Sequence, residues 1–513
     1  MDDEDPRSYE EAIASPNRDN WQQAMDEELN SLSENKTWNL VPRPKNHKVL
    51  RGRWVYRTKL GLDGKVARYK ARWVVRGFEQ IEGINYNETY AAVVKPATCK
   101  ILFALAAVKN LKIEQMDVVT AFLYGPIKEE VYVEVPHGTD SGKNQVCLLN
   151  KALYGLKQAP RVWYETLTDF LESHGFIRSK YDHGLYFKPG EIYITIYVDD
   201  LKLIGADDAL IASVKNLLSG RFKMKDLGPA THYLGLEIVR TDTTLTLRQT
   251  TYIDQVLKKY RMENCNPVST PVDANVRLRK ADDEYVPSKE DVVAFQSMLG
   301  SIMYIMCQSR PDIAFGVSKL SQYAARPDNS HWTALKRILR YLSGTKEYGI
   351  VYGGSDFVLT GWTDSDWAGD LDDSRSTAGY VFLLAGGAIS WASRKQTSVA
   401  LSSTEAEYMA QKNAATEGIW LRGLLEELTL RDNAPTTIWA DNQGAIDLVE
   451  NPVHHRRTKH ISIQYHYTRE CVANGEIELV YVPTEEMIAD GLTKGQPRAR
   501  FNQFVNLLGL RQD

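Results

Sequence analysis

The sequence predicts a mixed α/β protein that is built from several domains. Its 513 residues are too many for one ordinary domain, and the hydrophobic and charged fractions, 43% and 25%, are typical of soluble globular proteins. Two β-hairpins are predicted in the first half, whereas strands and then alternating helices and strands are predicted from Phe357 onward. We see no apolar stretch of about twenty residues, so we expect no membrane partner.

Changes in pattern divide the chain into four segments. Residues 1–20 are polar and are expected to be flexible, and a helix with apolar residues on one face is expected to begin at Asn20. Residues 21–265 contain both predicted hairpins. Residues 266–355 begin with a charged, proline-containing linker, and residues 356–513 are expected to form a separate α/β domain.

Cysteine usage and the acidic amino terminus both bear on the cellular compartment. The five cysteines are scattered without CxxC spacing, and the amino terminus lacks a signal-peptide pattern. These features predict a reducing interior compartment and no structural zinc.

The cations of the chain are clustered although the net charge is −4. Between Arg51 and Arg76 nine residues are Lys or Arg and only Asp63 is acidic. With Asp63-Gly64 as its turn, this segment is predicted to be a hairpin whose cations project over an anionic ligand. A solvated strand surface is the alternative interpretation.

Three carboxylates predict a metal centre of the polymerase type. Asp199-Asp200 interrupts an apolar hairpin between Ile192–Val198 and Leu201–Ile204, and Asp117 follows a strand-like run. Nucleotidyl transfer requires two divalent ions, and hard ions such as magnesium prefer carboxylate oxygens.

The motifs around these carboxylates resemble those of one family. Tyr197-Val198-Asp199-Asp200 is similar to the YxDD box of reverse transcriptases. The segments 116–125 (MDVVTAFLYG) and 153–163 (LYGLKQAPRVW) resemble copia-family motifs in the expected order. The chain therefore resembles the reverse transcriptase–ribonuclease H part of a copia-like (pseudovirus-type) LTR retrotransposon polyprotein, over nearly its whole length after residue 20.

This resemblance implies a right-hand polymerase and several site residues. Fingers, palm and thumb would occupy residues 21–265, a connection region would lie within residues 266–355, and residues 356–513 would form an RNase H-like domain. The implied metal ligands of the polymerase are Asp117, Val118, Asp199 and Asp200. The implied substrate-binding residues are Lys70, Arg72, Phe122, Tyr154, Gly155 and Gln158. Phe122 would exclude a 2′-hydroxyl, and whether Lys70 or Arg72 contacts the triphosphate stays open.

A second carboxylate set is predicted in the last domain. Ribonuclease H folds take four carboxylates from a first strand, a helix, a later strand end and a late helix. The helical member is either Glu405 or Glu407; Ser402 to Glu405 has capping-box spacing, so Glu407 is preferred. The predicted catalytic and metal-binding residues are Asp364, Glu407, Asp441 and Asp490. The basic run Arg456, Arg457 and Lys459 is interpreted as a contact for substrate phosphates, with a solvated surface as the alternative.

The resemblance implies RNA- and DNA-templated DNA synthesis, together with RNase H cleavage of the RNA strand of RNA–DNA hybrids. Two Mg²⁺ ions per site are expected, and Mn²⁺ is expected to substitute for them. The expected partners are an RNA template, a DNA or tRNA primer, the RNA–DNA hybrid, dNTPs, and element-encoded integrase and capsid proteins. The expected location is the cytoplasm, within virus-like particles. A domesticated, non-catalytic nucleic-acid-binding relic is the alternative, although all seven carboxylates are present.

Overall fold

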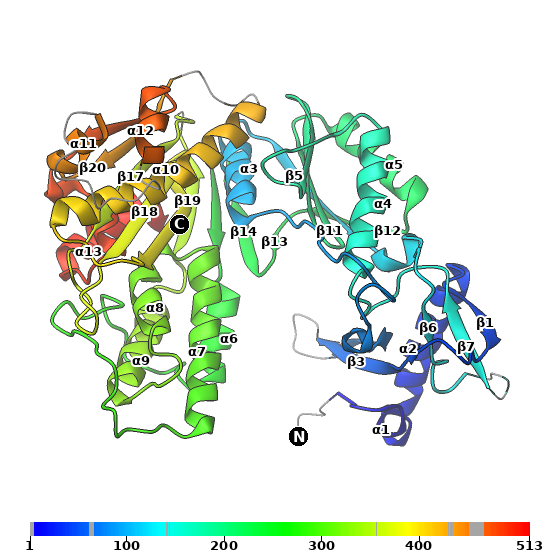
Figure 1. Ribbon diagram of the computed structural model, residues 1–513. Helices are drawn as coiled ribbons and strands as arrows, with labels where there is room; N and C mark the ends of the chain where they lie inside the picture. The colour runs from blue at the N-terminus through cyan, green and yellow to red at the C-terminus, as the bar shows by residue number, and fades with distance from the viewer. Residues whose placement is uncertain are drawn as a thin grey trace.

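The computed structural model describes residues 5–60, 66–139, 142, 144–354, 356–428, 430, 434–450 and 466–512. These residues form the mixed α/β fold that was predicted. Figure 1 shows two columns of structure that meet at the top, near helix α3 (Pro96–Val108). Nowhere in the described ranges does a helix combine the length and apolar character needed to cross a bilayer.

The amino-terminal region is a small β structure that is backed by helices. Helix α2 (Arg18–Glu34) packs on the predicted basic hairpin, formed by β3 (Gly52–Leu60) and β4 (Val66–Val75). Its Trp21 lies edge-on to Tyr56 and Tyr69, with ring centroids 5.2 and 4.7 Å away. A neighbouring sheet has the order β1-β7-β6-β2, with bounds Trp38–Pro42, Gln145–Leu149, Tyr132–Val133 and Val49–Leu50.

The segment 1–20 was predicted to be flexible, but its described residues, 5–20, include a helix. Helix α1 spans Tyr9–Ala14, and Ser8 caps it by accepting a hydrogen bond from the Glu11 N–H. Ala12 is fully buried, and the Tyr9 ring packs edge-on to His137. So short a helix carries no readable periodicity, and its stability comes from these tertiary contacts.

A six-stranded sheet forms the centre of the second region, which corresponds to the predicted palm. Its order is β12-β5-β11-β10-β9-β8, with bounds Met224–Pro229, Lys112–Val118, Asp200–Gly205, Ile192–Tyr197, Leu185–Lys188 and Ile177–Arg178. Alternate residues face opposite sides. Met116 and Leu201 pack into the apolar cluster of α4 (Ala159–Ser173) and α5 (Asp208–Arg221). Ile113 and Ile204 instead join the cluster that includes α3.

A five-stranded sheet joins distant parts of the chain. Its order is β13-β14-β15-β16-β22, with bounds His232–Tyr233, Leu236–Arg240, Thr244–Arg248, Gly349–Gly353 and Leu510–Arg511. Four helices lie between β15 and β16 in the chain: α6 (Thr250–Lys259), α7 (Lys289–Gln308), α8 (Ala314–Ser321) and α9 (Asn329–Gly344). The strands of this sheet come from both sides of residues 265 and 355, so the sheet spans two of the predicted segment boundaries. The division into domains stays a prediction.

The last region is an α/β domain with a mixed sheet in the order β19-β18-β17-β20-β21. The strand bounds are Gly387–Lys395, Thr377–Leu384, Thr360–Ser365, Thr436–Ala440 and Ile477–Tyr481. Strands β19, β18 and β17 are antiparallel, whereas β17, β20 and β21 are parallel. The helices are α10 (Ser403–Glu427), α11 (Gln443–Glu450), α12 (His466–Ala473) and α13 (Arg498–Leu507). This order of elements matches the predicted pattern.

The last region packs directly on the palm. Glu427 of α10 accepts hydrogen bonds from the Ser179 hydroxyl and the Lys180 N–H, at 2.5 and 2.9 Å. The Lys95 ammonium lies 4.1 Å from the centroid of the Trp420 ring, and Trp420 donates to the Tyr181 carbonyl. These contacts join the two columns of Figure 1 at their top.

Candidate active sites

The structure brings the first three predicted carboxylates to one end of the palm sheet. Asp117 on β5 and Asp200 on β11 are direct partners across these antiparallel strands, and Asp199 lies in the two-residue turn between β10 and β11. Burial raises the pKa of Asp117, and repulsion from Asp199 and Asp200 raises it further. Because the charged form of Asp117 is disfavoured here, a cation that binds at this site would stabilise it.

The turn that carries Asp199 is strained and is held from two sides. Val198 has a φ of +59°, a left-handed conformation that is unfavourable for a β-branched residue. The Trp163 indole N–H donates to the Val198 carbonyl at 2.7 Å, and the Val118 N–H donates to the Asp199 carbonyl at 2.8 Å. Val118, one of the implied metal ligands, thus supports the turn, while its side chain is buried. Strain of this kind persists where surrounding contacts impose it and is frequent at functional sites.

The predicted nucleotide-binding side chains form one connected group beside this turn. The Arg72 guanidinium lies 4.4 Å from the centroid of the Tyr154 ring, and that ring is 5.1 Å from the Phe122 ring, edge to face. Burial lowers the pKa of Lys70, and the charge of Lys70 opposes the rise in the pKa of Asp117. Lys70 of β4 therefore acts electrostatically on Asp117 of the palm.

Gly155 and Gln158 shape the loop before α4. Gly155 has a φ of +91°, and a Cβ there would lie 2.1 Å from the Val75 carbonyl oxygen, so only glycine fits. Gln158 is 2% exposed; it donates to the Asn85 carbonyl at 2.8 Å and accepts from Gln80 at 2.9 Å. These contacts give Gln158 a structural role, and its substrate contact stays a prediction.

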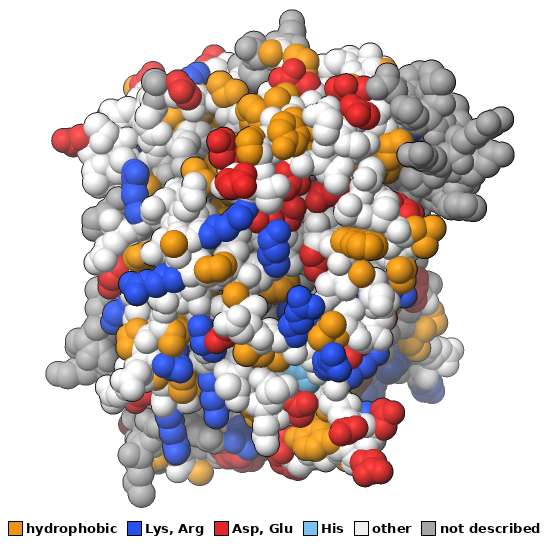
Figure 2. All heavy atoms as spheres, turned by 90° about the vertical axis from the view of Figure 1, so that its left-hand side faces the viewer, with side chains coloured by type: hydrophobic (Ala, Val, Ile, Leu, Met, Phe, Trp, Pro, Cys, Tyr) orange, Lys and Arg blue, Asp and Glu red, His pale blue; other side chains and the backbone are white. Residues whose placement is uncertain are grey.

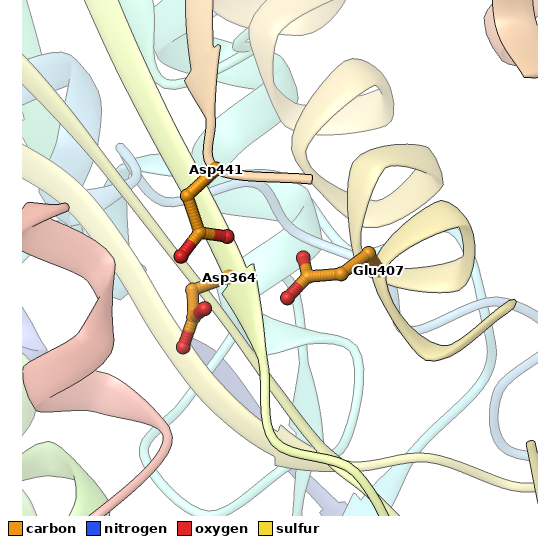
Figure 3. A group of neighbouring side chains, drawn as sticks. All are labelled: Asp364, Glu407 and Asp441. Atoms are coloured by element: carbon orange, nitrogen blue, oxygen red, sulfur yellow. The ribbon is translucent and has the colours of Figure 1, made fainter. Parts of the chain in front are cut away.

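Asp364, Glu407 and Asp441 form the tightest carboxylate group in the described part of the chain. One oxygen from each lies within 4.8 Å of the others, a spacing that the polymerase trio does not reach. Asp364 lies near the end of β17, Glu407 lies on α10 and Asp441 follows β20. Figure 3 shows the Glu407 and Asp441 carboxylates pointing toward Asp364. Burial raises the pKa of Asp364 to about 7, with a further contribution from Asp490, and burial places the pKa of Glu407 well above its ordinary value.

Asp490, the fourth predicted carboxylate, is adjacent but paired with cations. It lies on the short 3-10 helix η6 (Ile488–Leu492), is fully buried, and forms ion pairs with Lys494 at 2.6 Å and with Arg500. Glu405 has the predicted capping role: its N–H donates to Ser402, and its carboxylate accepts from the Leu401 N–H. The basic run Arg456, Arg457 and Lys459 lies outside the described residues.

Several supporting residues were not identified from the sequence. The Thr493 hydroxyl donates to Asp364, the Thr484 hydroxyl donates to Asp441 at 2.8 Å, and the Ser365 N–H donates to Glu407 at 3.1 Å. In the palm, the Lys202 ammonium donates to Asp200 at 2.6 Å. The alternation of a strand places residue 202 on the face of residue 200, so this partner was open to prediction.

The acidic group suits a hard divalent cation. The Glu407 Oε2 atom is buried and, among the described residues, no hydrogen-bond donor reaches it. Three carboxylates whose oxygens converge are the donors that Mg²⁺ or Mn²⁺ prefers. Burial disfavours the charged forms of Asp364 and Glu407, which a cation would stabilise.

The chain is similar to a known protein family and to a yeast transposon protein. Residues 35–274 match the family "Reverse transcriptase (RNA-dependent DNA polymerase)". The putative transposon Ty5-1 protein of Saccharomyces cerevisiae is 36% identical over 312 residues, which are 59% of this chain and all of that protein. The chain belongs to the copia-like retrotransposon reverse transcriptases.

A longer relative and one solved structure are also similar to parts of this reverse transcriptase chain. The Pol polyprotein of transposon TNT 1-94 from Nicotiana tabacum is 43% identical over the whole chain, which covers 39% of that polyprotein. The chain thus spans about two fifths of this longer relative. A foamy viral protease-reverse transcriptase, solved with an RNA/DNA hybrid, aligns with a TM-score of 0.48 and 13% identity over 90% of this chain and 54% of that one.

Proposed function

We propose that this chain synthesises DNA on RNA and DNA templates and cleaves the RNA strand of RNA–DNA hybrids, in the replication of a retrotransposon. The observation that carries the proposal is the meeting of Asp117 with the Asp199-Asp200 turn, beside the cations of β4. A second carboxylate group in a separate domain supports the nuclease activity.

In DNA synthesis, the primer 3′-oxygen attacks the α-phosphorus of a dNTP, a new P–O bond forms, and pyrophosphate leaves. Asp117, Asp199 and Asp200 would hold Mg²⁺, which when bound lowers the pKa of the attacking hydroxyl and offsets phosphate charge. Lys70 and Arg72 bind the triphosphate through charge-assisted hydrogen bonds. Arg72 is stacked on Tyr154, which restricts its rotation and positions it for this contact.

In RNA cleavage, a water oxygen attacks the phosphorus of a phosphodiester in the RNA strand and forms a new P–O bond. One P–O bond to a ribose oxygen breaks, that oxygen takes up a proton, and the strand is left with a phosphate on one end and a hydroxyl on the other. Asp364, Glu407, Asp441 and Asp490 would hold the metal ions in this site. The Thr493 and Thr484 hydroxyls orient two of these carboxylates. Fixed orientation matters because a displaced ligand loses much of the rate.

A hollow near the second site is proposed as a contact for a nucleic-acid partner. It has a volume of about 640 Å³ between the linker, α8, α9 and the loop after β17, and its lining includes the cations Arg277, Lys319, Arg337 and Lys494 beside the carboxylates Asp273 and Asp366. Figure 2 views this side of the molecule, where Lys and Arg side chains lie below a group of acidic ones. Such contacts would favour the phosphate backbone of a hybrid and weaken with salt. RNA template, DNA or tRNA primer and dNTPs follow as ligands; integrase, capsid proteins and virus-like particles are proposed from the polyprotein relatives.

Primer extension tests the proposed function. The purified chain, with poly(rA)–oligo(dT), dTTP and Mg²⁺, is expected to lengthen the primer, and EDTA is expected to stop the reaction. A protein that binds the hybrid but does not extend the primer would instead be a domesticated, non-catalytic relic. Extension in Mn²⁺ as well as Mg²⁺ is expected, since both ions take carboxylate ligands.

Phe122 is proposed to select deoxynucleotides through the contact of its ring with the sugar. Phe122→Val shortens the side chain, and the space it vacates admits a 2′-hydroxyl. We expect the ratio of rUTP to dTTP incorporation efficiency to rise by about tenfold or more. The measurement is kcat/KM for each nucleotide. Phe176→Val is the control, because Phe176 is buried in the palm core and its described ring contact is with Lys188; an unchanged ratio in Phe122→Val would contradict the role.

A further inference from the structure

Lys202 is a fully buried lysine at the base of the polymerase centre. Its side chain is 0% exposed, and its ammonium lies 2.6 Å from Asp200 Oδ1. The ammonium also lies 4.7 Å from the centroid of the buried Tyr233 ring. Burying a charged lysine costs several kcal/mol unless a partner compensates it. A cation at this place therefore needs an explanation beyond packing.

The register of the sheet explains how Lys202 reaches its partner. Asp200 is paired with Asp117, and Lys202 is paired with Gln115 two residues along the same strands. Side chains two residues apart in a strand share a face, so all four lie on one side of the sheet. The Gln115 amide donates to Asp200 Oδ1 at 3.0 Å, the oxygen that Lys202 also reaches. Two donors thus fix one oxygen of Asp200, and Oδ2 is left for a ligand.

We propose that Lys202, assisted by Gln115, is a positioning residue for DNA synthesis: it fixes the orientation of Asp200 and offsets part of the negative charge of the Asp117, Asp199 and Asp200 trio. This inference rests on the proposed polymerase function. Lys202 lies on the face of the sheet that is covered by Tyr233 and Cys99. In the described contacts it touches neither Phe122 nor the β4 cations. Its effect should therefore fall on the chemical step and on metal binding, and not on nucleotide affinity.

The test compares Lys202→Met and Gln115→Leu with wild type in steady-state primer extension. For Lys202→Met we expect kcat to fall about 30-fold or more, KM for dTTP to stay within about twofold, and the half-saturating Mg²⁺ concentration to change by about threefold or more. Gln115→Leu, which removes a neutral donor, should lower kcat by about three- to tenfold. Anisotropy with labelled hybrid and thermal unfolding check that each variant is folded.

Lys215→Met is the matched control. Lys215 is also largely buried in the palm and pairs with Glu114 and Asp226, at 2.9 and 2.8 Å, but neither carboxylate belongs to the trio. Its kcat and Mg²⁺ dependence should match wild type. Unchanged extension in Lys202→Met, an equal loss in Lys215→Met, or loss of hybrid binding together with extension would overturn the positioning role. Failure of the wild-type protein to extend would overturn the proposed function, and this inference with it.

Discussion

Glu28 is a buried carboxylate behind the basic hairpin. It lies on α2, is 8% exposed, and accepts a hydrogen bond of 3.4 Å from the Trp73 N–H of β4. Burial raises its pKa to about 7, although this hydrogen bond and the charges of Arg72 and Lys70 oppose the shift. The stability of the region formed by α2 and β4 should therefore depend on pH.

The sign of this dependence follows from the raised pKa. The folded state holds the Glu28 proton more tightly than the unfolded state. The contribution of this protonation to the free energy of unfolding is therefore full below pH 4.5 and is lost as pH rises through about 7. Relative to Glu28→Gln, wild type should lose up to about 3 kcal/mol of stability across this window. Thermal unfolding at pH 5 and pH 8 measures the difference.

Glu27→Gln serves as the control for Glu28→Gln. Glu27 is the neighbouring residue of α2, and its ion pair with Arg68 is solvent-exposed. The unfolding temperatures of this variant and wild type should therefore stay close at both pH values. If Glu28→Gln also tracked wild type at pH 8, the raised pKa would be refuted.

The contact between β4 and the loop before α4 depends on the backbone of Gly155. Gly155→Ala would place a Cβ 2.1 Å from the Val75 carbonyl oxygen, and we expect a loss of about 3 kcal/mol or more, with a higher KM for dTTP because Tyr154 and Arg72 move. The comparison variant is Gly190→Ala: Gly190 also has a positive φ, +74°, but an added Cβ would have no atom within 4 Å. It should cost only about 1 kcal/mol and leave KM unchanged. Equal unfolding temperatures for the two variants would contradict the crowding at residue 155.

Much of the element structure was predictable because it depends on local patterns. Both hairpins form in the expected strands, and the apolar face of α2 packs as its periodicity indicates; the Asp63-Gly64 turn itself lies outside the described residues. Helix α1 was missed because tertiary contacts stabilise it. The burial of Gln158 depends on Gln80 and Asn85, which are distant in sequence and which one sequence does not identify; the pairing of Lys202 with Asp200, two residues away on one strand, was open to prediction.

The segment Ser309 to Ala314 directly follows α7 and is joined to α9 by side-chain contacts. Arg310 and Asp312 are fully buried and form a bidentate pair, with 3.0 and 2.7 Å hydrogen bonds. Tyr341 donates to the same carboxylate at 2.6 Å, and Arg310 also donates to the Thr345 carbonyl. Every part of this pair is thus hydrogen-bonded, which a buried pair requires.

Arg310→Met removes the charge that balances Asp312. Because the remaining carboxylate is buried, we expect a loss of about 3–5 kcal/mol in the free energy of unfolding. Lys346→Met is the control, since its ion pair with Asp254 is exposed and should be worth less than about 1 kcal/mol. If denaturant unfolding gave similar midpoints for both variants, the buried Arg310–Asp312 pair would not stabilise the fold.

The two carboxylate groups lie in different domains, the palm sheet and the last α/β domain, which contact each other through α10. If each group serves one reaction, either reaction can be removed without the other. The sequence predicted the members of each group, whereas the hydroxyls and amides that hold them became visible only in the folded chain.

The most direct measurement is a paired assay of Asp199→Asn and Asp441→Asn on one labelled RNA–DNA substrate. We expect Asp199→Asn to lose primer extension by about 100-fold or more and to keep RNA cleavage within about twofold, and Asp441→Asn to show the reverse. Loss of both activities in each variant, with hybrid binding intact, would contradict the assignment of two separate metal centres.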